Sequence, residues 1–304
     1  MARSFTLPEP AARRAVSLIR RHVLNPALPW ERQRARMAAA MVAAHHPKGV
    51  EKSDDIVAGV PVEVLTPKHQ RPTGTLVHVH GGGFTVGAPV VNRAWAGALC
   101  ERLGLEVIQP AYRLAPEHPF PAGLDDVTAV LGEILQRFDP ATVALSGDSA
   151  GANLAMAATQ RRIRDGGSLP AALVLLSPWL DLTYDRLSDP NLLARDPMLN
   201  PEWLAASATA YAPGQLENPE VSPIFGELVG LPPVFIQGGS DDILAPDAER
   251  LTRALAPLGE VSLSVGARLW HDFSLQVGML KAADQALEVT VDHLVATLAL
   301  AVSD

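Results

Sequence analysis

A serine held between glycines is the first group in this sequence that could carry out covalent chemistry. Ser149 lies in GDSAG, residues 147–151, directly after the apolar run 142–148 and before the helix-like segment 150–164. A Gly-x-Ser-x-Gly pattern between a strand and a helix is typical of a sharp turn that presents a nucleophilic hydroxyl. Such a serine could instead be the N-cap of the helix, but its position directly after a buried strand favours the nucleophile.

A serine hydroxyl is a weak nucleophile at neutral pH and needs a base, which in turn needs an orienting acid. On a turn of this kind, the acid and the base follow the serine in the chain. Of the nine histidines, only His271 and His293 follow Ser149. His293 falls in a helical pattern, whereas His271 follows the strand-like run 261–266, at a strand end where loops carry catalytic groups. His271 is therefore the predicted base.

The acid is expected after the strand-like run 233–239, where the chain carries Asp241, Asp242 and Asp247. Acidic residues at the start of a helix can also complement the helix dipole. Asp247 has the most helix-like position, which favours a structural role for it. Spacing alone does not separate Asp241 from Asp242.

Three glycines after His80 indicate the part of the site that would bind a developing negative charge. Attack on an acyl carbonyl creates an oxyanion, which needs preorganised donors. Backbone N–H groups can approach it closely at glycine, which has no β-carbon. A flexible loop is the simple alternative, but it would not predict the neighbouring GDSAG. We predict an oxyanion hole formed by the glycine loop and Ala150, the residue after the nucleophile.

Short β-rich runs that alternate with helical segments would position these groups. Several runs are continuously apolar, as in strands buried on both faces of a parallel sheet. The alternation predicts an α/β fold with a mostly parallel sheet and helices on both faces. The expected strands are 62–67, 75–80, 105–112, 142–148, 172–178, 233–239 and 261–266, and the expected helices are 90–103, 124–138, 150–164, 246–257 and 282–301.

Two segments do not follow the alternation. The first 50 residues read as helices before the first strand, and residues 183–225 hold polar turns and a short helix around 201–211. We interpret both as a helical cap over one edge of the sheet. The predicted division is a catalytic core of 51–182 and 221–304, with a cap of 1–50 and 183–220.

Composition narrows the class of protein. The net charge of −8 argues against a nucleic-acid partner. Eight arginines among the first 36 residues are interpreted as the solvated face of helices whose apolar stripe is Val16, Leu18, Ile19 and Val23. The single cysteine, Cys100, allows no intrachain disulfide and no cysteine-based metal site, and is expected to be a small buried hydrophobe.

The start of the chain has no apolar stretch typical of a secretory signal. No apolar run approaches about 18 residues, so we expect no membrane span and a cytoplasmic location.

Six motifs keep a fixed order along the chain: HGGGF (80–84), YRLAPEHPFPAGLDD (112–126), GDSAGANLA (147–155), SPWLDLT (177–183), DPML (196–199) and WHDF (270–273). Together they resemble the hormone-sensitive lipase-like family of α/β-hydrolases, the bacterial family IV esterases, through nearly all of residues 60–290. The resemblance implies an α/β-hydrolase fold with a helical cap. It also implies a carboxylic ester hydrolase that needs no metal or cofactor.

The resemblance separates the two acids that spacing left equal. The family's acid is followed by leucine two positions later and then by Asp-Ala-x-Arg-Leu. Asp242 with Leu244 fits that pattern, together with DAERL at 247–251, and Asp241 does not. The implied catalytic triad is Ser149, Asp242 and His271.

The resemblance likewise implies that the second and third glycines of the loop, Gly82 and Gly83, donate to the oxyanion together with Ala150. We therefore expect a serine carboxylesterase that hydrolyses short- to medium-chain acyl esters through an acyl-enzyme intermediate. A lactone hydrolase or an amide deacetylase would use the same groups. The non-enzyme alternative is a hydrolase-fold receptor for a small ligand, although such receptors typically lose part of the triad. The last strand, 261–266, could pair between two copies of the chain in a homodimer.

The remaining polar and aromatic residues have less specific interpretations. His80 is expected to shape the glycine loop by hydrogen bonding. Phe84, Trp203 and Tyr211 could line an acyl pocket, although aromatic residues of a cap are more often part of a core. A buried polar network that holds loops is expected of Tyr112, Arg113, Glu117 and Asp126.

Overall fold

An eight-stranded sheet forms the centre of the structure, a computed structural model that describes residues 6–41, 48–183 and 189–300. Its strand order is β1-β2-β4-β3-β5-β6-β7-β8. β2 is antiparallel to both of its neighbours, and all other pairs are parallel. The strands are β1 (Val50–Val57), β2 (Val60–Pro67), β3 (Gly74–Val79), β4 (Leu105–Pro110), β5 (Val143–Asp148), β6 (Ala172–Leu176), β7 (Val234–Gly239) and β8 (Val261–Gly266).

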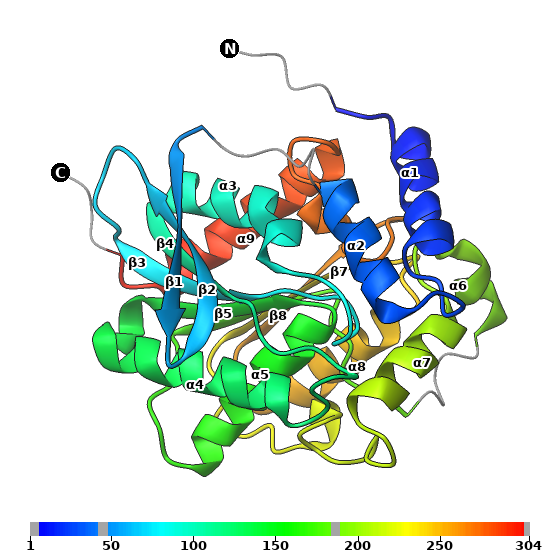
Figure 1. Cartoon of the computed structure of the whole chain (residues 1–304). Coiled ribbons are helices and arrows are strands. Elements are labelled where there is room, and N and C mark those ends of the chain that lie inside the picture. The colour runs from blue at the N-terminus through cyan, green and yellow to red at the C-terminus, as the bar shows by residue number, and fades with distance from the viewer. Residues whose placement is uncertain (1–5, 42–47, 184–188, 301–304) are drawn as a thin grey trace.

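Helices cover both faces of this sheet, which is why the central strands are buried throughout and mostly apolar. Every residue of β3, β5, β6 and β7 is buried. One apolar cluster lies under α3 and α9, and a larger one lies under α4, α5 and α8 on the other face (Figure 1). These helices are α3 (Arg93–Leu103), α4 (Ala122–Arg137), α5 (Ala150–Arg164), α8 (Ala245–Leu255) and α9 (Lys281–Thr297). The α/β-hydrolase fold expected from the sequence is confirmed.

The pairing of β3 with β5 brings the two motifs of the predicted site together. Val79 at the end of β3 lies opposite Gly147 near the end of β5. Because parallel neighbours end at the same edge of a sheet, the loop after β3 and the turn after β5 meet there. The loops that follow β7 and β8 leave the sheet at this edge too, since β7 and β8 pair in parallel up to Gly239 and Gly266.

The first strand, β1, was not predicted. Only its first and last residues are buried, and the six between them are exposed. It pairs with β2 through a two-residue turn, in which Ala58 and Gly59 both have positive φ, at 50° and 80°. A two-residue turn with positive φ at both positions has the same twist as the two strands that it joins, and is therefore favoured in β-hairpins. A strand with so few inward side chains has no apolar alternation for a sequence pattern to detect.

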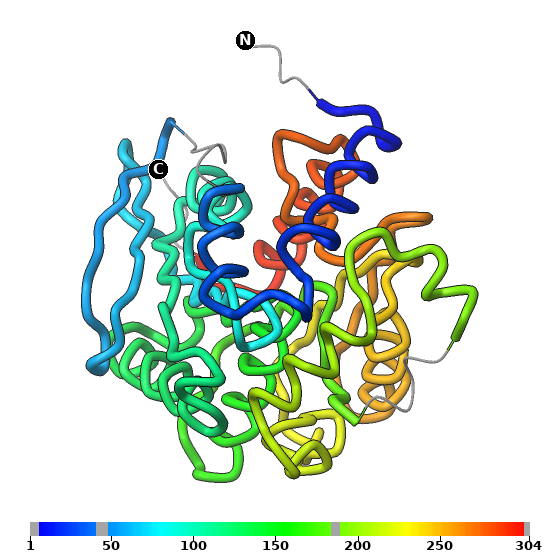
Figure 2. Tube along the Cα trace, turned by 45° about the vertical axis from the view of Figure 1, so that its right-hand side comes forward, coloured from blue at the N-terminus to red at the C-terminus, as the bar shows by residue number. Residues whose placement is uncertain are grey.

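Four helices lie together at one side of the sheet in Figures 1 and 2, although they come from two distant parts of the chain. They are α1 (Glu9–His22), α2 (Trp30–Met41), α6 (Pro190–Arg195) and α7 (Pro201–Tyr211). Trp203 Nε1 of α7 donates to Gln33 Oε1 of α2 at 2.8 Å, and Arg20 of α1 donates to the Asp196 carbonyl after α6 at 2.7 Å. These bonds support the proposed assignment of both segments to one cap, whose residues 1–5, 42–47 and 184–188 lie outside the described part.

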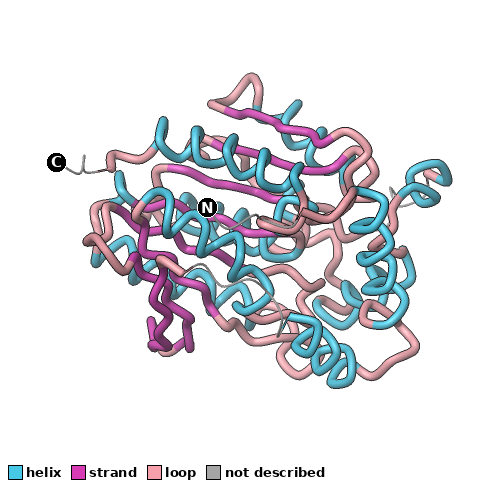
Figure 3. Tube along the Cα trace, turned by 90° about the horizontal axis from the view of Figure 1, so that it is seen from above, coloured by secondary structure: helices cyan, strands magenta, loops and turns pink. Residues whose placement is uncertain are grey.

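The short helix expected around 201–211 is present as α7, whereas α6 was not predicted. The apolar stripe expected on the first helix is correct for Val16, Ile19 and Val23, which pack inward. It is wrong for Leu18, which is 54% exposed because its position in the helical turn faces solvent. No helix in the described residues is long and apolar enough to cross a membrane. Figure 3 shows from above how helices flank the central strands of the sheet.

Candidate active site

Ser149 occupies a strained turn between β5 and α5. Its φ of 53° and ψ of −119° lie where L-residues are rarely found. Glycine is required on both sides of Ser149, because neighbouring backbone atoms lie too close to leave room for a β-carbon. A β-carbon on Gly147 would collide with the Gly151 carbonyl, and one on Gly151 would collide with the carbonyl of Val79 in the neighbouring strand. The turn can therefore be this sharp only with glycine at both positions.

His271 and Asp242 lie side by side at the same sheet edge. The Nδ1 atom of His271 is 2.9 Å from Asp242 Oδ2, and both side chains are almost fully buried. Asp242 Oδ1 accepts a hydrogen bond from the Leu244 backbone at 2.8 Å, which fixes the orientation of the carboxylate. A buried carboxylate on Nδ1 selects the tautomer that leaves Nε2 free to act as a base.

The other two acids considered from the sequence have different partners. Asp241 forms an ion pair with Arg13 of α1. Asp247 lies in α8 and accepts hydrogen bonds from the backbone N–H groups of Leu180 and Asp181, at 2.7 Å and 3.0 Å. Neither carboxylate contacts His271, so the geometry agrees with the choice of Asp242 as the acid.

Ser149 and His271 both line one cavity, but no hydrogen bond joins them in the described structure. The Nε2 atom of His271 is instead 3.1 Å from Asp272 Oδ2. Catalytic hydrogen bonds are often long or misaligned without a substrate. Asp272 was not singled out in the sequence analysis, because the order of residues does not say which ring nitrogen a neighbouring side chain will face.

The glycine loop lies against the nucleophile turn. Gly81 N–H donates to Asp148 Oδ1 at 2.9 Å, which fastens the loop to the end of β5. Gly82 and Gly83 have φ values of 111° and 59°, and both line the cavity beside Ser149. Among the described residues, their N–H groups donate to no protein acceptor. Ala150 is the first residue of α5, so its N–H has no partner within the helix.

His80 supports this loop from behind, as expected. Its Nδ1 is 2.8 Å from the Gly81 carbonyl oxygen, and its ring stacks on Tyr112 with centroids 4.4 Å apart. Burial lowers the pKa of His80 to about 4, although the Gly81 carbonyl opposes the shift. The ring is therefore neutral at pH 7, and its Nδ1–H donates to Gly81. Tyr112 in turn donates its hydroxyl to the His80 carbonyl at 2.8 Å.

The buried network expected of Tyr112, Arg113, Glu117 and Asp126 is instead three separate contacts. Tyr112 pairs with the loop as described, and Arg113 binds Asp126 through Nε and Nη2, at 2.7–3.1 Å. Glu117 pairs with Arg34 of α2 at 2.7 Å. The side chains of Arg113 and Glu117 are 50% and 43% exposed, whereas the Asp126 side chain is only 10% exposed.

His78 and Ser146 make a serine–histidine contact away from the proposed triad, with His78 Nδ1 2.8 Å from Ser146 Oγ. Both side chains are fully buried inside the fold, and neither lines the cavity. His78 also contacts Asn92, whose amide donates to Asp148, the residue before Ser149. No substrate can reach Ser146, so it is not a nucleophile. The network instead holds Asp148, and with it the turn that carries Ser149.

The cavity at Ser149 has a volume of about 210 Å³ and is mainly apolar. Trp203 lines it, in agreement with the expected acyl pocket. Phe84 and Tyr211 do not line it: they are 1% and 2% exposed and stack on each other. Their assignment to substrate contact is therefore corrected to packing between the glycine loop and α7.

The first helix forms part of the cavity wall, which the sequence analysis missed. Ala12, Val16 and Ile19 of α1 line the cavity, together with Met37 of α2. Their helical spacing was visible as an amphipathic stripe, but a stripe does not reveal which apolar surface it will cover. Both segments that we assign to the cap therefore contribute to the wall of the cavity that holds Ser149.

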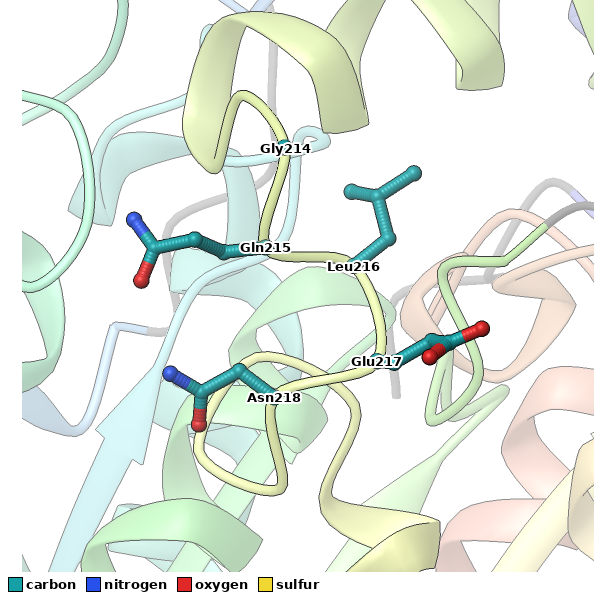
Figure 4. Close-up of a pocket in the computed structure, with 5 residues that line it drawn as sticks. All are labelled: Gly214, Gln215, Leu216, Glu217 and Asn218. Atoms are coloured by element: carbon teal, nitrogen blue, oxygen red, sulfur yellow. The ribbon is translucent and has the colours of Figure 1, made fainter.

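A second hollow lies at the surface around the loop 214–218, with a volume of about 490 Å³. Figure 4 shows Gln215 and Asn218 extending to one side of this loop and Leu216 and Glu217 to the other. None of the predicted catalytic residues lines it.

In the described residues, no group of three or more His, Cys, Asp or Glu side chains is arranged to hold a metal ion. Cys100 is buried, and burial raises its pKa to about 12.

Comparison with known proteins agrees with this arrangement. A family profile described as the alpha/beta hydrolase fold matches residues 76–275, a range that holds the glycine loop, Ser149, Asp242 and His271. The sheet and the residues at its edge thus define an α/β-hydrolase.

Related proteins narrow the class further. An acetyl-hydrolase from Streptomyces hygroscopicus is 37% identical over 246 residues, covering 79% of this chain and 82% of the relative. An esterase from Acinetobacter venetianus is 36% identical over 220 residues, covering 71% and 72%. The crystal structure of an esterase from the bacterial hormone-sensitive lipase family matches with a TM-score of 0.90 at 29% identity, over 96% of this chain and 100% of the other. The chain belongs to the hormone-sensitive lipase-like esterases of the α/β-hydrolase superfamily and is a carboxylic ester hydrolase.

Proposed function

We propose that the protein is a serine carboxylesterase that hydrolyses short- to medium-chain acyl esters through an acyl-enzyme intermediate. One observation carries the proposal: Ser149, His271 and the glycine loop line the same apolar cavity, and Asp242 is bound to the far side of His271. This combination provides a nucleophile, a base with its orienting acid, and free N–H donors within one site.

His271 takes the proton of Ser149 at Nε2 while the serine oxygen attacks the ester carbonyl. Asp242 stabilises the imidazolium that forms. The N–H groups of Gly82, Gly83 and Ala150 stabilise the oxyanion, and His271 then gives its proton to the departing alcohol. Water repeats the sequence on the acyl-enzyme and releases the acid. This chemistry needs no metal or cofactor.

The character of the cavity supports the substrate class. Its wall is mainly apolar side chains, which favour an aliphatic acyl group over a charged one. A volume of about 210 Å³ accommodates short and medium chains better than long ones. The name of the Streptomyces relative, an acetyl-hydrolase, fits the short end of this range.

Turnover of p-nitrophenyl esters from acetate to laurate tests the proposal. We expect the highest kcat/KM among the shorter chains and no turnover in Ser149→Ala with an unchanged circular dichroism spectrum. A fluorophosphonate should label the wild type and not the variant. Wild-type kcat in Ser149→Ala would overturn the assignment. Lactones and anilides in the same panel distinguish a lactonase or an amide deacetylase from an esterase.

A homodimer through β8 is proposed for the assembly. β8 is the last strand of the sheet, and its Val265 side chain is 52% exposed. An open strand edge with an exposed apolar residue favours pairing with a second copy. Light scattering after size exclusion should give twice the chain mass of 32.3 kDa, and Val265→Lys should halve the observed mass. A wild-type monomer would rule out this assembly.

A further inference from the structure

Asp272 has an unusual backbone conformation directly after the proposed base. Its φ is 53° and its ψ is 27°, the left-handed region in which aspartate is one of the few tolerated side chains. The Ser177 hydroxyl holds this conformation by accepting a hydrogen bond from Asp272 N–H at 3.0 Å. The left-handed turn directs the carboxylate back toward the ring of His271.

The imidazole of His271 consequently lies between two carboxylates. Asp242 Oδ2 is 2.9 Å from Nδ1, and Asp272 Oδ2 is 3.1 Å from Nε2. The Asp272 side chain is 11% exposed, and its Oδ1 atom is buried with no partner among the described residues. Asp272 also lines the cavity that holds Ser149. The Nε2 edge, which must accept the proton of Ser149, is thus in contact with the Asp272 carboxylate instead.

Charges around this pair favour binding of a proton. Burial raises the pKa of Asp272 to about 7, with His271 lowering it and the carboxylates of Asp148 and Asp242 raising it further. Burial lowers the pKa of His271, but Asp242 and Asp272 outweigh this effect and raise it well above its usual range. From the segment between α6 and α7, Asp196 is a further acid near Asp242 and His271.

We propose that Asp272 is a positioning residue that holds the Nε2 edge of His271 in the resting enzyme and competes with Ser149 for it. One proton is shared between Nε2 and Asp272 Oδ2 in this state. The proton must pass to solvent before Nε2 has a free lone pair for the Ser149 hydroxyl. The later proton transfers are unchanged, so the role of Asp272 is to set the pH at which His271 becomes a base. This inference rests on the proposed esterase function.

The pH dependence of kcat/KM for p-nitrophenyl acetate tests the inference. Asp272→Asn removes a carboxylate that favours the protonated ring, so the acid limb should move down by about one pH unit, a tenfold change in proton affinity. On the acid side of the profile, the variant should therefore keep a larger fraction of its own maximal kcat/KM than the wild type does. Asp165→Asn, a matched loss of one exposed charge on the far end of α5, should leave the limb in place.

An unchanged acid limb in folded Asp272→Asn would overturn the inference. If that variant does not fold, the imidazole nitrogens of His271 can be titrated by ¹⁵N NMR in the wild type, with His271→Gln for assignment. A ring still protonated above pH 7 supports the inference, and ordinary titration near 6.5 or below contradicts it. Ser149→Ala separates the two proposals: its activity would contradict the esterase mechanism, whereas its inactivity with an unmoved Asp272→Asn limb contradicts only the role of Asp272.

Discussion

Phe84 and Tyr211 stack face to face, with ring centroids 3.9 Å apart and an angle of 6° between their planes. Phe84 is the residue after the glycine loop, and Tyr211 is the last residue of α7. The stack therefore joins the loop that carries the proposed oxyanion donors to the cap. Aromatic pairs of this kind contribute about 0.5–1.5 kcal/mol beyond the area that they bury.

Two substitutions at Tyr211 should separate its ring from its hydroxyl. Tyr211→Ala removes a buried ring and should lower the free energy of unfolding by about 3–5 kcal/mol. Tyr211→Phe should be neutral or slightly stabilising, because the hydroxyl is buried with no partner among the described residues. Urea unfolding followed by tryptophan fluorescence measures both. A large loss in Tyr211→Phe would show that the hydroxyl has a partner after all.

A β-carbon on Gly83 should impair catalysis more than stability. Its φ is 59°, and an added β-carbon would lie 2.6 Å from the Trp203 ring, so the loop must shift. Loss of one oxyanion donor typically lowers kcat about 100-fold or more. We expect Gly83→Ala to show this fall in kcat with little change in KM.

Gly166 offers a matched control for that experiment. Its φ of 67° is nearly the same, but a β-carbon there meets no atom within 4 Å. Gly166→Ala should therefore lose about 1 kcal/mol of stability from the left-handed backbone alone and keep its kcat. Equal kcat values in the two variants would contradict the oxyanion role of the loop.

Arg13 should control how α1 closes the cavity. Besides its ion pair with Asp241, it donates to the carbonyls of Arg195 at 2.7 Å and Arg268 at 2.9 Å, and lies 5.6 Å from the ring centre of Trp270. Its helix supplies part of the cavity wall, so loosening it should weaken substrate binding. Arg13→Ala should raise KM for p-nitrophenyl butyrate about tenfold, equivalent to about 1.4 kcal/mol.

Arg14, the next residue, is exposed on the same helix and serves as the control. Arg14→Ala removes the same charge without touching these contacts, so its KM should stay near the wild-type value. Similar KM values for both variants would mean that the position of α1 does not depend on Arg13.

Glu220 should contribute stability that depends on pH. Hydrogen bonds from Arg161, and then from Arg164, lower its pKa to about 2 against the burial that opposes them. Because the folded-state pKa lies below the ordinary 4.5, the contribution is complete above about pH 5 and is lost as the pH falls toward 2. The side chain is 26% exposed, so Glu220→Gln should cost about 1 kcal/mol or less at pH 7.

Denaturant unfolding at pH 7 and pH 3 should therefore show a smaller difference between wild type and Glu220→Gln at the lower pH. Glu217→Gln, at an exposed position in the same segment, should differ little from wild type at either pH. A difference for Glu220→Gln that is as large at pH 3 as at pH 7 would contradict the ion-pair explanation.

Much of the framework was predictable because its signals are local. Buried parallel strands appear as apolar runs, and the turn at Ser149 needs glycines on both sides for steric reasons that show in the sequence. The chain order of Ser149, Asp242 and His271 follows from the order in which the strands end. The sequence also predicts that these three residues lie close together, because the carboxyl ends of parallel strands meet at one edge of the sheet.

The remaining features depend on contacts that a linear pattern does not contain. β1 has six exposed residues between two buried ones, so its pairing is determined by a turn and not by apolar alternation. Phe84 and Tyr211 look like pocket residues in sequence, but they turn toward each other and away from the cavity. The contact of Asp272 with Nε2 arises from a left-handed φ, which no residue spacing indicates.

The hydrogen bond from Gly81 to Asp148 spans 67 positions of the chain. During synthesis, the glycine loop is complete long before β5 exists, and it lacks this particular anchor until that strand leaves the ribosome and pairs with β3. Contacts of such sequence separation form slowly, because loop closure must come first. A nascent chain that stops before β5 therefore carries neither the nucleophile nor a fixed place for the oxyanion, and hydrolytic competence should arise only after the later strands have been made.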